Sequence, residues 1–287
     1  MIRYNTTVAE LTDKIGARWL ADAAERTAAF RAAGKYTEKA GSWSKVKPVY
    51  MQLQHGKCAY CERQFGSDPQ SRIEHDIEHF RPKSSVKVWP PAGATFQYSF
   101  PTGPASDVGY FLLPYNLLNY AAACKKCNSS FKANYFPIEA AARAVDADTP
   151  EVLAGELPLL IYPIAEVDDD PEDLLSFEGF VPVAVKRRGR KARRARVIID
   201  FFALDTREEL LRERAFLLKA IYVAHRNRKS RDPLVRDDSL QTLAQIDLPG
   251  FPHRNCARAF SRLCVQDTDT AREYYGAAIQ YLRSFGA

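Results

Sequence analysis

Two pairs of cysteines carry the most specific chemistry in this sequence. Cys58 and Cys61 stand three residues apart in "KCAYCE", and Cys124 and Cys127 repeat that spacing in "ACKKCN". Four thiolates in two such pairs are typical of a tetrahedral zinc site. The interval between the pairs exceeds the usual zinc-ribbon spacing, so we expect the ion to clamp two distant segments together. Because four protein ligands leave no open position, the predicted zinc is structural.

Composition favours a cytoplasmic protein with reduced thiols. The 287 residues are 46% hydrophobic and 26% charged, and no run approaches the roughly 18 apolar residues that a membrane span needs. The beginning of the sequence lacks an apolar signal core. Disulfides are therefore not expected. Cys256 and Cys264, which lack the spacing of the two pairs, are expected to be small buried hydrophobes.

The motifs between residues 57 and 138 follow a specific order. The first cysteine pair is followed by Glu78-His79 with Pro82, then by Asn119 five residues before the second pair, and then by Asn128. This order resembles the HNH endonuclease superfamily, in whose zinc-bearing branch four cysteines support a ββα-metal nuclease site. Over roughly residues 42 to 220, the segments "KCAYCE", "IEHFRPKS", "CNSSFKANYFP", "LPLLIYP" and "IIDFFALDTREELLRERA" together resemble the PtuB-like HNH nucleases of Septu and retron-associated antiphage systems.

The resemblance implies the hydrolysis of phosphodiester bonds. This reaction needs an activated water and a cation that neutralises charge on the phosphate and the leaving oxygen. The family pattern assigns His79 as the general base, and imidazole suits that role because it titrates near neutral pH. It assigns Glu78 and Asn128 as ligands of a catalytic Mg²⁺ or Mn²⁺, which prefers oxygen ligands. Asn119 would orient the base or its loop.

Two of these assignments have rivals in the sequence. Residues 75, 77 and 79 would share one face of a strand, so His75 is expected near His79 as a spectator or a substrate contact. Asn116 competes with Asn119 as the middle asparagine. In both cases the residue that fits the motif is the stronger candidate.

Two residues depart from the family pattern. The acidic residue is Glu78 where many superfamily members have Asp, which lengthens the reach by one methylene. Ala133 stands where related sequences often have Gly, which makes that turn less permissive. Neither change removes an essential group.

A basic segment runs from Lys186 to Arg196 and contains eight Lys or Arg residues and no acid. The whole chain carries +6, so the remainder carries −2 and the entire excess lies in this segment. The segment is interpreted either as a solvated loop or as a surface that binds phosphates. The candidate substrate contacts are Arg81, Lys83 and Lys132 near the predicted site, and Arg187, Arg188, Arg190, Lys191, Arg193 and Arg194 in the basic segment.

Helices are predicted before the motif region. Thr7 and Glu10 fit a capping box that opens an apolar helical stripe, and Gly34 is a plausible stop. A second short helix is predicted around Trp43 to Leu53, with a stripe that predicts core packing and no function. Residues 88–109, rich in Pro and Gly, predict an inserted loop.

The region that follows the basic segment is also predicted to be largely helical. "RVIIDFFAL" predicts a strand or a short buried segment. Thr206 and Glu209 fit a second capping box, and Thr270 with Glu273 is predicted to open a final helix.

We therefore predict an α+β protein with a small zinc-clamped ββα-metal (HNH) core embedded in a largely helical protein. The expected function is a metal-dependent endonuclease that cuts DNA as an antiphage effector. Two alternatives stay open, an RNA-cleaving effector with the same site and an inactive zinc-stabilised module that binds nucleic acid. The resemblance also implies an ATPase partner of the PtuA type. The predicted regions are 1–56 (helical), 57–138 (nuclease core), 139–205 (mixed extension with the basic segment) and 206–287 (helical).

Overall fold

The computed structural model describes residues 1–39, 41–66 and 75–285, and the protein is α+β, as predicted. The chain divides into two compact units. We call residues 3–60 and 65–170 the site unit, and residues 1–2, 61–64 and 171–287 the helical unit. The division near residue 170 falls inside the predicted extension 139–205.

A two-stranded antiparallel pair forms the centre of the site unit. Strand β1 (His75–His79) pairs with β2 (Tyr120–Cys124), with His75 opposite Cys124 and His79 opposite Tyr120. The π-helical turn η4 (Lys126–Lys132) follows β2 and packs against both strands, which gives a strand–strand–helix core. The other elements of this unit are α1 (Val8–Ile15), α2 (Ala17–Ala33), η1 (Trp43–Val46), α3 (Lys47–Leu53), η3 (Leu117–Asn119) and α4 (Pro150–Ala154).

The N-terminal helices begin as predicted but are interrupted. Thr7 and Glu10 form the reciprocal capping box that opens α1, and Gly34, with φ +65°, ends α2. The expected single helix is wrong, because Gly16 has φ +89° and separates α1 from α2. Such a backbone is easily adopted only by glycine.

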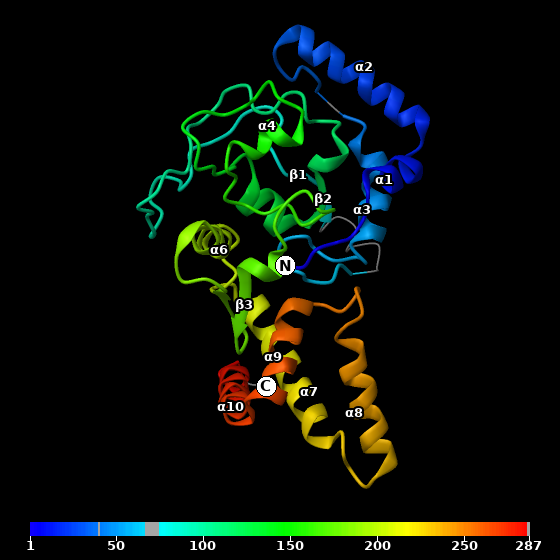
Figure 1. Ribbon diagram of the computed structural model, residues 1–287, viewed down its shortest axis with the longest axis vertical. Helices are drawn as coiled ribbons and strands as arrows, with labels where there is room; N and C mark the ends of the chain where they lie inside the picture. The colour runs from blue at the N-terminus through cyan, green and yellow to red at the C-terminus, as the bar shows by residue number, and fades with distance from the viewer. Residues whose placement is uncertain (40, 67–74, 286–287) are drawn as a thin grey trace. The chain divides into compact units, whose positions relative to one another are not determined.

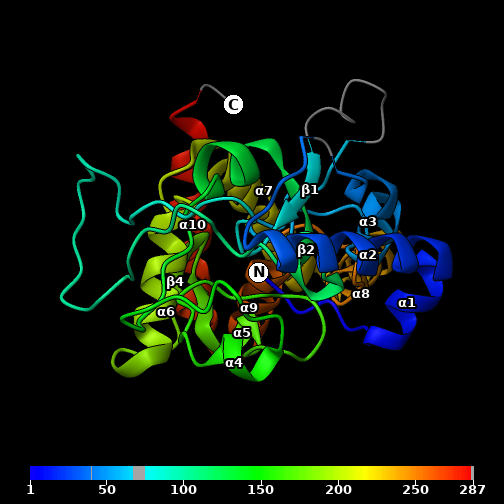
Figure 2. The same ribbon diagram turned by 90° about the horizontal axis from the view of Figure 1, so that it is seen from above.

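Helix α3 lies beside the β1–β2 pair in both views (Figures 1 and 2). Gln54, which caps α3 and is fully buried, satisfies the outer edge of β2. Its Oε1 accepts the Ala122 N–H at 2.7 Å, and its Nε2 donates to the Ala122 carbonyl at 2.8 Å and to the Lys57 carbonyl at 2.9 Å. The amide side chain therefore replaces a third strand and fixes the segment that leads to Cys58.

The predicted loop is confirmed, and the apolar segment "LPLLIYP" of the extension is largely buried. Residues 88–109 contain no helix or strand, and a single bridge joins Val86 to Ser106 at their edge. Leu159, Leu160 and Ile161 are buried almost completely. This apolar segment belongs to the core of the site unit.

Helix α7 is the centre of the helical unit and packs against α8, α9 and α10 (Figure 1). Its buried face joins Cys256 and Cys264 of α9, which are the small buried hydrophobes predicted above. No helix in the described ranges is long and apolar enough to cross a membrane. The elements of this unit are α5 (Pro171–Leu174), β3 (Leu175–Glu178), β4 (Val181–Ala184), α6 (Gly189–Phe201), α7 (Glu208–Asn227), α8 (Pro233–Gln245), α9 (Arg254–Gln266) and α10 (Thr268–Arg283).

The segment "RVIIDFFAL" is helical, so the predicted strand is wrong and the predicted burial is right. Its residues 196–201 form the second half of α6, in which Val197, Ile198 and Ile199 are buried, and residues 202–204 form the turn that follows. A run of β-branched residues favours a strand. Here the basic residues before it continue the same helix, and burial of one face decides the structure.

Two predicted helix caps are also corrected. Helix α7 begins after Arg207, and Thr206 makes no side-chain cap, while Glu209 pairs instead with Arg207 at 2.9 Å. Helix α10 is confirmed, but its cap is Asp267, whose carboxylate accepts from the backbone N–H of Thr270 at 3.0 Å.

Candidate active site

One pocket of the site unit contains three of the predicted catalytic residues. Its volume is about 240 Å³, and Glu78, His79 and Asn128 line it together with Lys83. Glu78 and His79 come from the end of β1, and Asn128 from the first turn of η4. The order of strand, strand and helix thus brings a carboxylate, an imidazole and an amide to one place. The remaining lining residues are Trp43, Ile77, Pro82, Ser129, Ala133 and Asn134.

The backbone carbonyl of Pro114 fixes the tautomer of His79. The His79 Nε2 lies 3.1 Å from this oxygen, and since a carbonyl can only accept, Nε2 carries the proton. The same oxygen accepts a hydrogen bond from the Tyr120 hydroxyl. Burial lowers the pKa of His79 to about 3, with the positive charge of Lys83 acting in the same direction. The ring is therefore neutral at physiological pH, and Nδ1 is the atom that can accept a proton.

Glu78 is paired with a buried lysine. The Lys132 Nζ lies 3.2 Å from Glu78 Oε1, and the exposed fractions of the two side chains are 0% and 5%. Burial raises the pKa of Glu78 to about 7, while the Lys132 ammonium opposes this shift. Lys132, predicted as a phosphate contact, instead faces the carboxylate and the His79 carbonyl at 3.5 Å. Because Lys132 contacts Oε1, the predicted cation would bind Glu78 through its other oxygen, Oε2.

The turn after η4 has the strained backbone that the sequence suggested. Ala133 has φ +38° and ψ −125°, and its N–H donates to the Asn128 carbonyl at 2.7 Å. Only glycine adopts such angles without strain. The alanine at this position is therefore strained where it closes the helical turn that carries Asn128.

Asn119 holds the loop that follows His79. Its Oδ1 accepts the Arg81 N–H at 2.7 Å, and its Nδ2 donates to the carbonyls of Arg81 at 3.1 Å and Leu113 at 3.0 Å. Asn116, the rival asparagine, caps η3 by accepting the Leu118 N–H. The geometry favours Asn119 as the residue that orients this loop.

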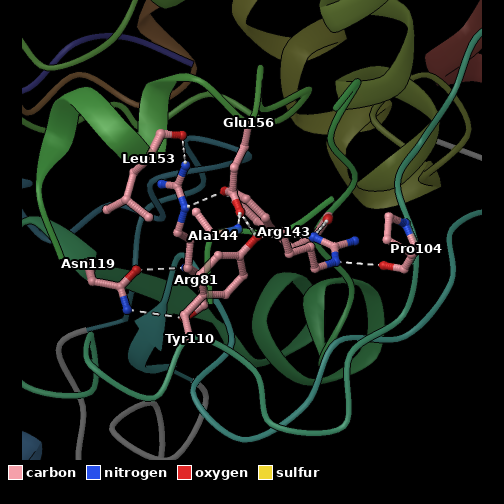
Figure 3. A network of polar contacts seen from close by, with 9 residues as sticks. Arg81, Pro104, Tyr110, Asn119, Arg143, Ala144, Leu153 and Glu156 are labelled. Carbon is pink, nitrogen blue, oxygen red and sulfur yellow. Dashed lines mark hydrogen bonds and ion pairs between the residues drawn. The ribbon is translucent and has the colours of Figure 1, made fainter. Parts of the chain in front are cut away.

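Arg81 belongs to a buried polar network and is not available to a phosphate (Figure 3). Its Nε lies 3.2 Å from Glu156 Oε2, and its Nη2 donates to the Leu153 carbonyl at 2.8 Å. Glu156, 2% exposed, also accepts from the Tyr110 hydroxyl at 2.9 Å and from the Ala144 N–H at 2.7 Å. This carboxylate therefore joins the loop after β1 to the extension.

We expect Glu156→Gln to lower the free energy of unfolding by about 2–3 kcal/mol, because it leaves the buried Arg81 guanidinium without a charged partner. Chemical denaturation measures the loss. Asp148→Asn is the matched control, since Asp148 pairs with Arg31 on the surface and should cost less than about 1 kcal/mol. Equal losses in the two variants would contradict a special role for the network.

The four predicted zinc ligands lie together. The ligand atoms of Cys58, Cys61, Cys124 and Cys127 are all within 4.8 Å of one another, and three of the four residues are buried. Four sulfurs at such distances fit the tetrahedral coordination of zinc. Cys124 ends β2, and Cys127 directly precedes Asn128, so an ion there would fix the helical turn of the pocket to the strand.

Of the other predicted residues near the site, Lys83 lines the pocket and His75 is not among the described residues that line it. His75 packs instead on the Phe65 ring at 4.5 Å. Sequence reasoning gave no function to Trp43, yet its indole lies on the His79 ring with centroids 4.9 Å apart and an interplanar angle of 86°. Trp43 belongs to an apolar stripe with helical spacing, and this pattern predicted only core packing.

The basic segment is only partly exposed. Lys186, Arg187 and Arg188 are exposed ahead of α6, but Arg194, predicted as a substrate contact, is completely buried. Arg190, Lys191 and Arg193 are intermediate, and Lys191 pairs with Asp173 at 3.0 Å. Arg196, at the end of the segment, is exposed but pairs with Asp200 at 2.9 Å, so the accessible charge that is not in an ion pair of the described residues lies mainly at the beginning.

Comparison with known proteins gives one informative similarity. The chain is 32% identical over 210 residues to the Septu protein PtuB of Bacillus mycoides (strain KBAB4). The aligned region covers 73% of this chain and 62% of the length of that protein. No family model and no solved structure matches the chain.

Proposed function

We propose that the chain is a metal-dependent HNH endonuclease that hydrolyses DNA and acts as the nuclease effector of an antiphage defence system. The observation that carries the proposal is the convergence of Glu78, His79 and Asn128 on one pocket beside a four-cysteine cluster. A module that only binds nucleic acid needs none of these three side chains in a shared pocket. The similarity to a Septu protein supports the role in defence.

In the proposed mechanism, His79 accepts the proton of the attacking water at Nδ1. The Pro114 carbonyl holds Nε2–H and keeps the lone pair on Nδ1. Glu78 and Asn128 would hold a Mg²⁺ or Mn²⁺ through their oxygens, and this ion supplies the positive charge opposite the phosphate when it is bound. Asn119 keeps the loop after His79 in place.

Lys83 is the lysine that can face a phosphate. It lines the pocket, is partly exposed and has no carboxylate within 4.0 Å among the ion pairs of the described residues. Lys132, by contrast, is committed to Glu78. We assign Lys83 to the charge that develops on the phosphate during cleavage.

A nicking assay with supercoiled plasmid tests the proposal. We expect nicked and linear products with Mg²⁺ or Mn²⁺ and none when these ions are omitted, while mass spectrometry verifies that zinc is retained. Labelled single-stranded DNA and RNA in parallel reactions identify the sugar. Cleavage of RNA alone would favour the RNA effector, and retention of nucleic acid without cleavage would favour the binding module.

We expect replacement of Lys186, Arg187 and Arg188 by glutamine to weaken DNA binding and to lower the slope of log Kd against log salt concentration by about 2–3. Fluorescence anisotropy with a labelled duplex measures both. The control replaces Arg226, Lys229 and Arg231 by glutamine. These residues are also exposed in the helical unit, and their replacement removes the same charge. Similar losses in both variants would mean that net charge alone matters.

The resemblance to PtuB-like nucleases also supports an ATPase partner of the PtuA type. Regions 1–56 and 206–287 are the candidate docking surfaces. Co-purification of the chain with an ATPase of the PtuA type tests this part of the proposal, and separate elution would count against it.

A further inference from the structure

Trp43 contacts two of the groups that the proposed mechanism uses. Its ring meets the His79 ring edge to face, with centroids 4.9 Å apart. The Lys83 ammonium lies over the same indole, 4.5 Å from its centroid. One side chain from η1 therefore touches both the predicted base and the predicted phosphate contact.

A second aromatic ring completes the surroundings of Lys83. The Lys83 Nζ lies 5.7 Å from the centroid of Tyr36, and the rings of Tyr36 and Trp43 are 6.4 Å apart. Ring faces attract an ammonium without neutralising its charge, as a carboxylate would. The two rings thus restrict a flexible side chain and leave its charge available to a phosphate.

The backbone at Gly41 determines where Trp43 lies. A Cβ at Gly41 would come within 1.7 Å of Trp43 Cζ3, so the indole packs directly on the glycine Cα. Contacts this close leave the ring little freedom. Gly41 supports the indole, and the indole supports His79 and Lys83.

We propose that Trp43 is a positioning residue of the active site, which fixes the His79 imidazole and, together with Tyr36, holds the Lys83 ammonium toward the scissile phosphate of the substrate. The inference rests on the proposed nuclease function. It gives the segment before the zinc cluster a part in catalysis, although its spacing predicted only core packing.

A double-mutant cycle tests the link between Trp43 and Lys83. We expect Trp43→Leu and Lys83→Met each to lower kcat/KM by about ten- to hundredfold. The double variant should lose less than the product of the two single losses, because both changes remove the Trp43–Lys83 interaction while only Trp43→Leu also removes the contact with His79. Trp43→Phe, which retains a ring, should lose less than about fivefold. Gly41→Ala, which displaces the indole without removing it, should resemble Trp43→Leu.

Binding provides a readout that a purely structural role would not change. In the absence of Mg²⁺, Lys83→Met should reduce the salt slope of DNA binding by about 1, and Trp43→Leu should reduce it in the same direction without adding to the effect of Lys83→Met. Trp89→Phe is the control, because Trp89 is a buried aromatic residue of the site unit that packs on Tyr135 at 5.5 Å, outside the described pocket lining.

The outcomes separate the inference from the proposed function. Cleavage by the wild-type protein, together with non-additive losses in the double-mutant cycle, supports both the proposed function and the role of Trp43. Wild-type cleavage with fully additive losses overturns the link between Trp43 and Lys83. Wild-type cleavage with Trp43→Leu and Gly41→Ala as active as Trp89→Phe overturns the positioning role of Trp43 altogether. A wild-type protein that cleaves no nucleic acid, whether or not it binds any, overturns the proposed function and the inference together. Zinc content and thermal midpoints identify variants that lost activity by unfolding, and Trp43→Phe and Gly41→Ala then decide the question.

Discussion

Replacing His79 with alanine is expected to abolish detectable DNA cleavage, with a loss of about 10²–10⁴-fold in the rate of the chemical step. The reason is geometric. His79 lines the pocket beside Glu78, and the Pro114 carbonyl leaves Nδ1 as the proton acceptor. Single-turnover cleavage with excess enzyme measures the loss, because it isolates chemistry from product release.

His75→Ala is the matched control for this experiment. Both histidines lie on β1, and each is 7% exposed. His75 packs on Phe65 outside the described lining of the pocket, so most of the activity should remain. A variant without His79 that still cleaves, next to an inactive His75 variant, would reverse the assignment of the base.

Removal of the zinc ion is expected to unfold the site unit. The binding of structural zinc contributes about 10–16 kcal/mol in small zinc modules, which equals or exceeds the usual stability of a domain, about 5–15 kcal/mol. In this chain the four sulfurs connect the segment before β1 to the end of β2. We expect one zinc per chain in native mass spectrometry, and a large fall of the thermal midpoint when a strong chelator is added.

Single cysteine substitutions test which cysteines hold the zinc ion. Cys124→Ser should lose the zinc and become poorly soluble. Cys264→Ala should retain one equivalent of zinc, because Cys264 lies on α9 in the hydrophobic core of the helical unit. A wild-type protein free of zinc, or a Cys124→Ser variant that keeps a full equivalent, would contradict the assignment.

Local chemistry explains why part of the site was predictable from the sequence. The cysteine pairs and the Glu78-His79 motif are short patterns whose spacing reflects the geometry of a ligand set. The capping box at Thr7 and the stop at Gly34 are equally local, and the structure confirms both. The catalytic roles of Glu78, His79 and Asn128 stay predictions, although one pocket contains all three residues.

Features that depend on distant partners could not be predicted. Arg81 and Lys132 were expected to face a phosphate because they are basic and lie near the motif. Their partners, Glu156 and Glu78, become visible only in the folded chain. Arg194 was counted with the exposed basic residues, although the helical path of α6 turns it inward. A spacing pattern does not show which side of an element is covered.

The long excursion between β1 and β2 has a consequence for the synthesis of the protein. Residues 80–119 separate the two strands, and Asn128 follows the second strand. A nascent chain in which Asn128 has not yet emerged from the ribosome lacks the proposed cation ligand Asn128 and the predicted fourth zinc thiolate, Cys127. Domains form during translation only after their last contacting segment has emerged. The nuclease activity proposed above therefore requires synthesis beyond Asn128, and chains that end before this residue would lack it.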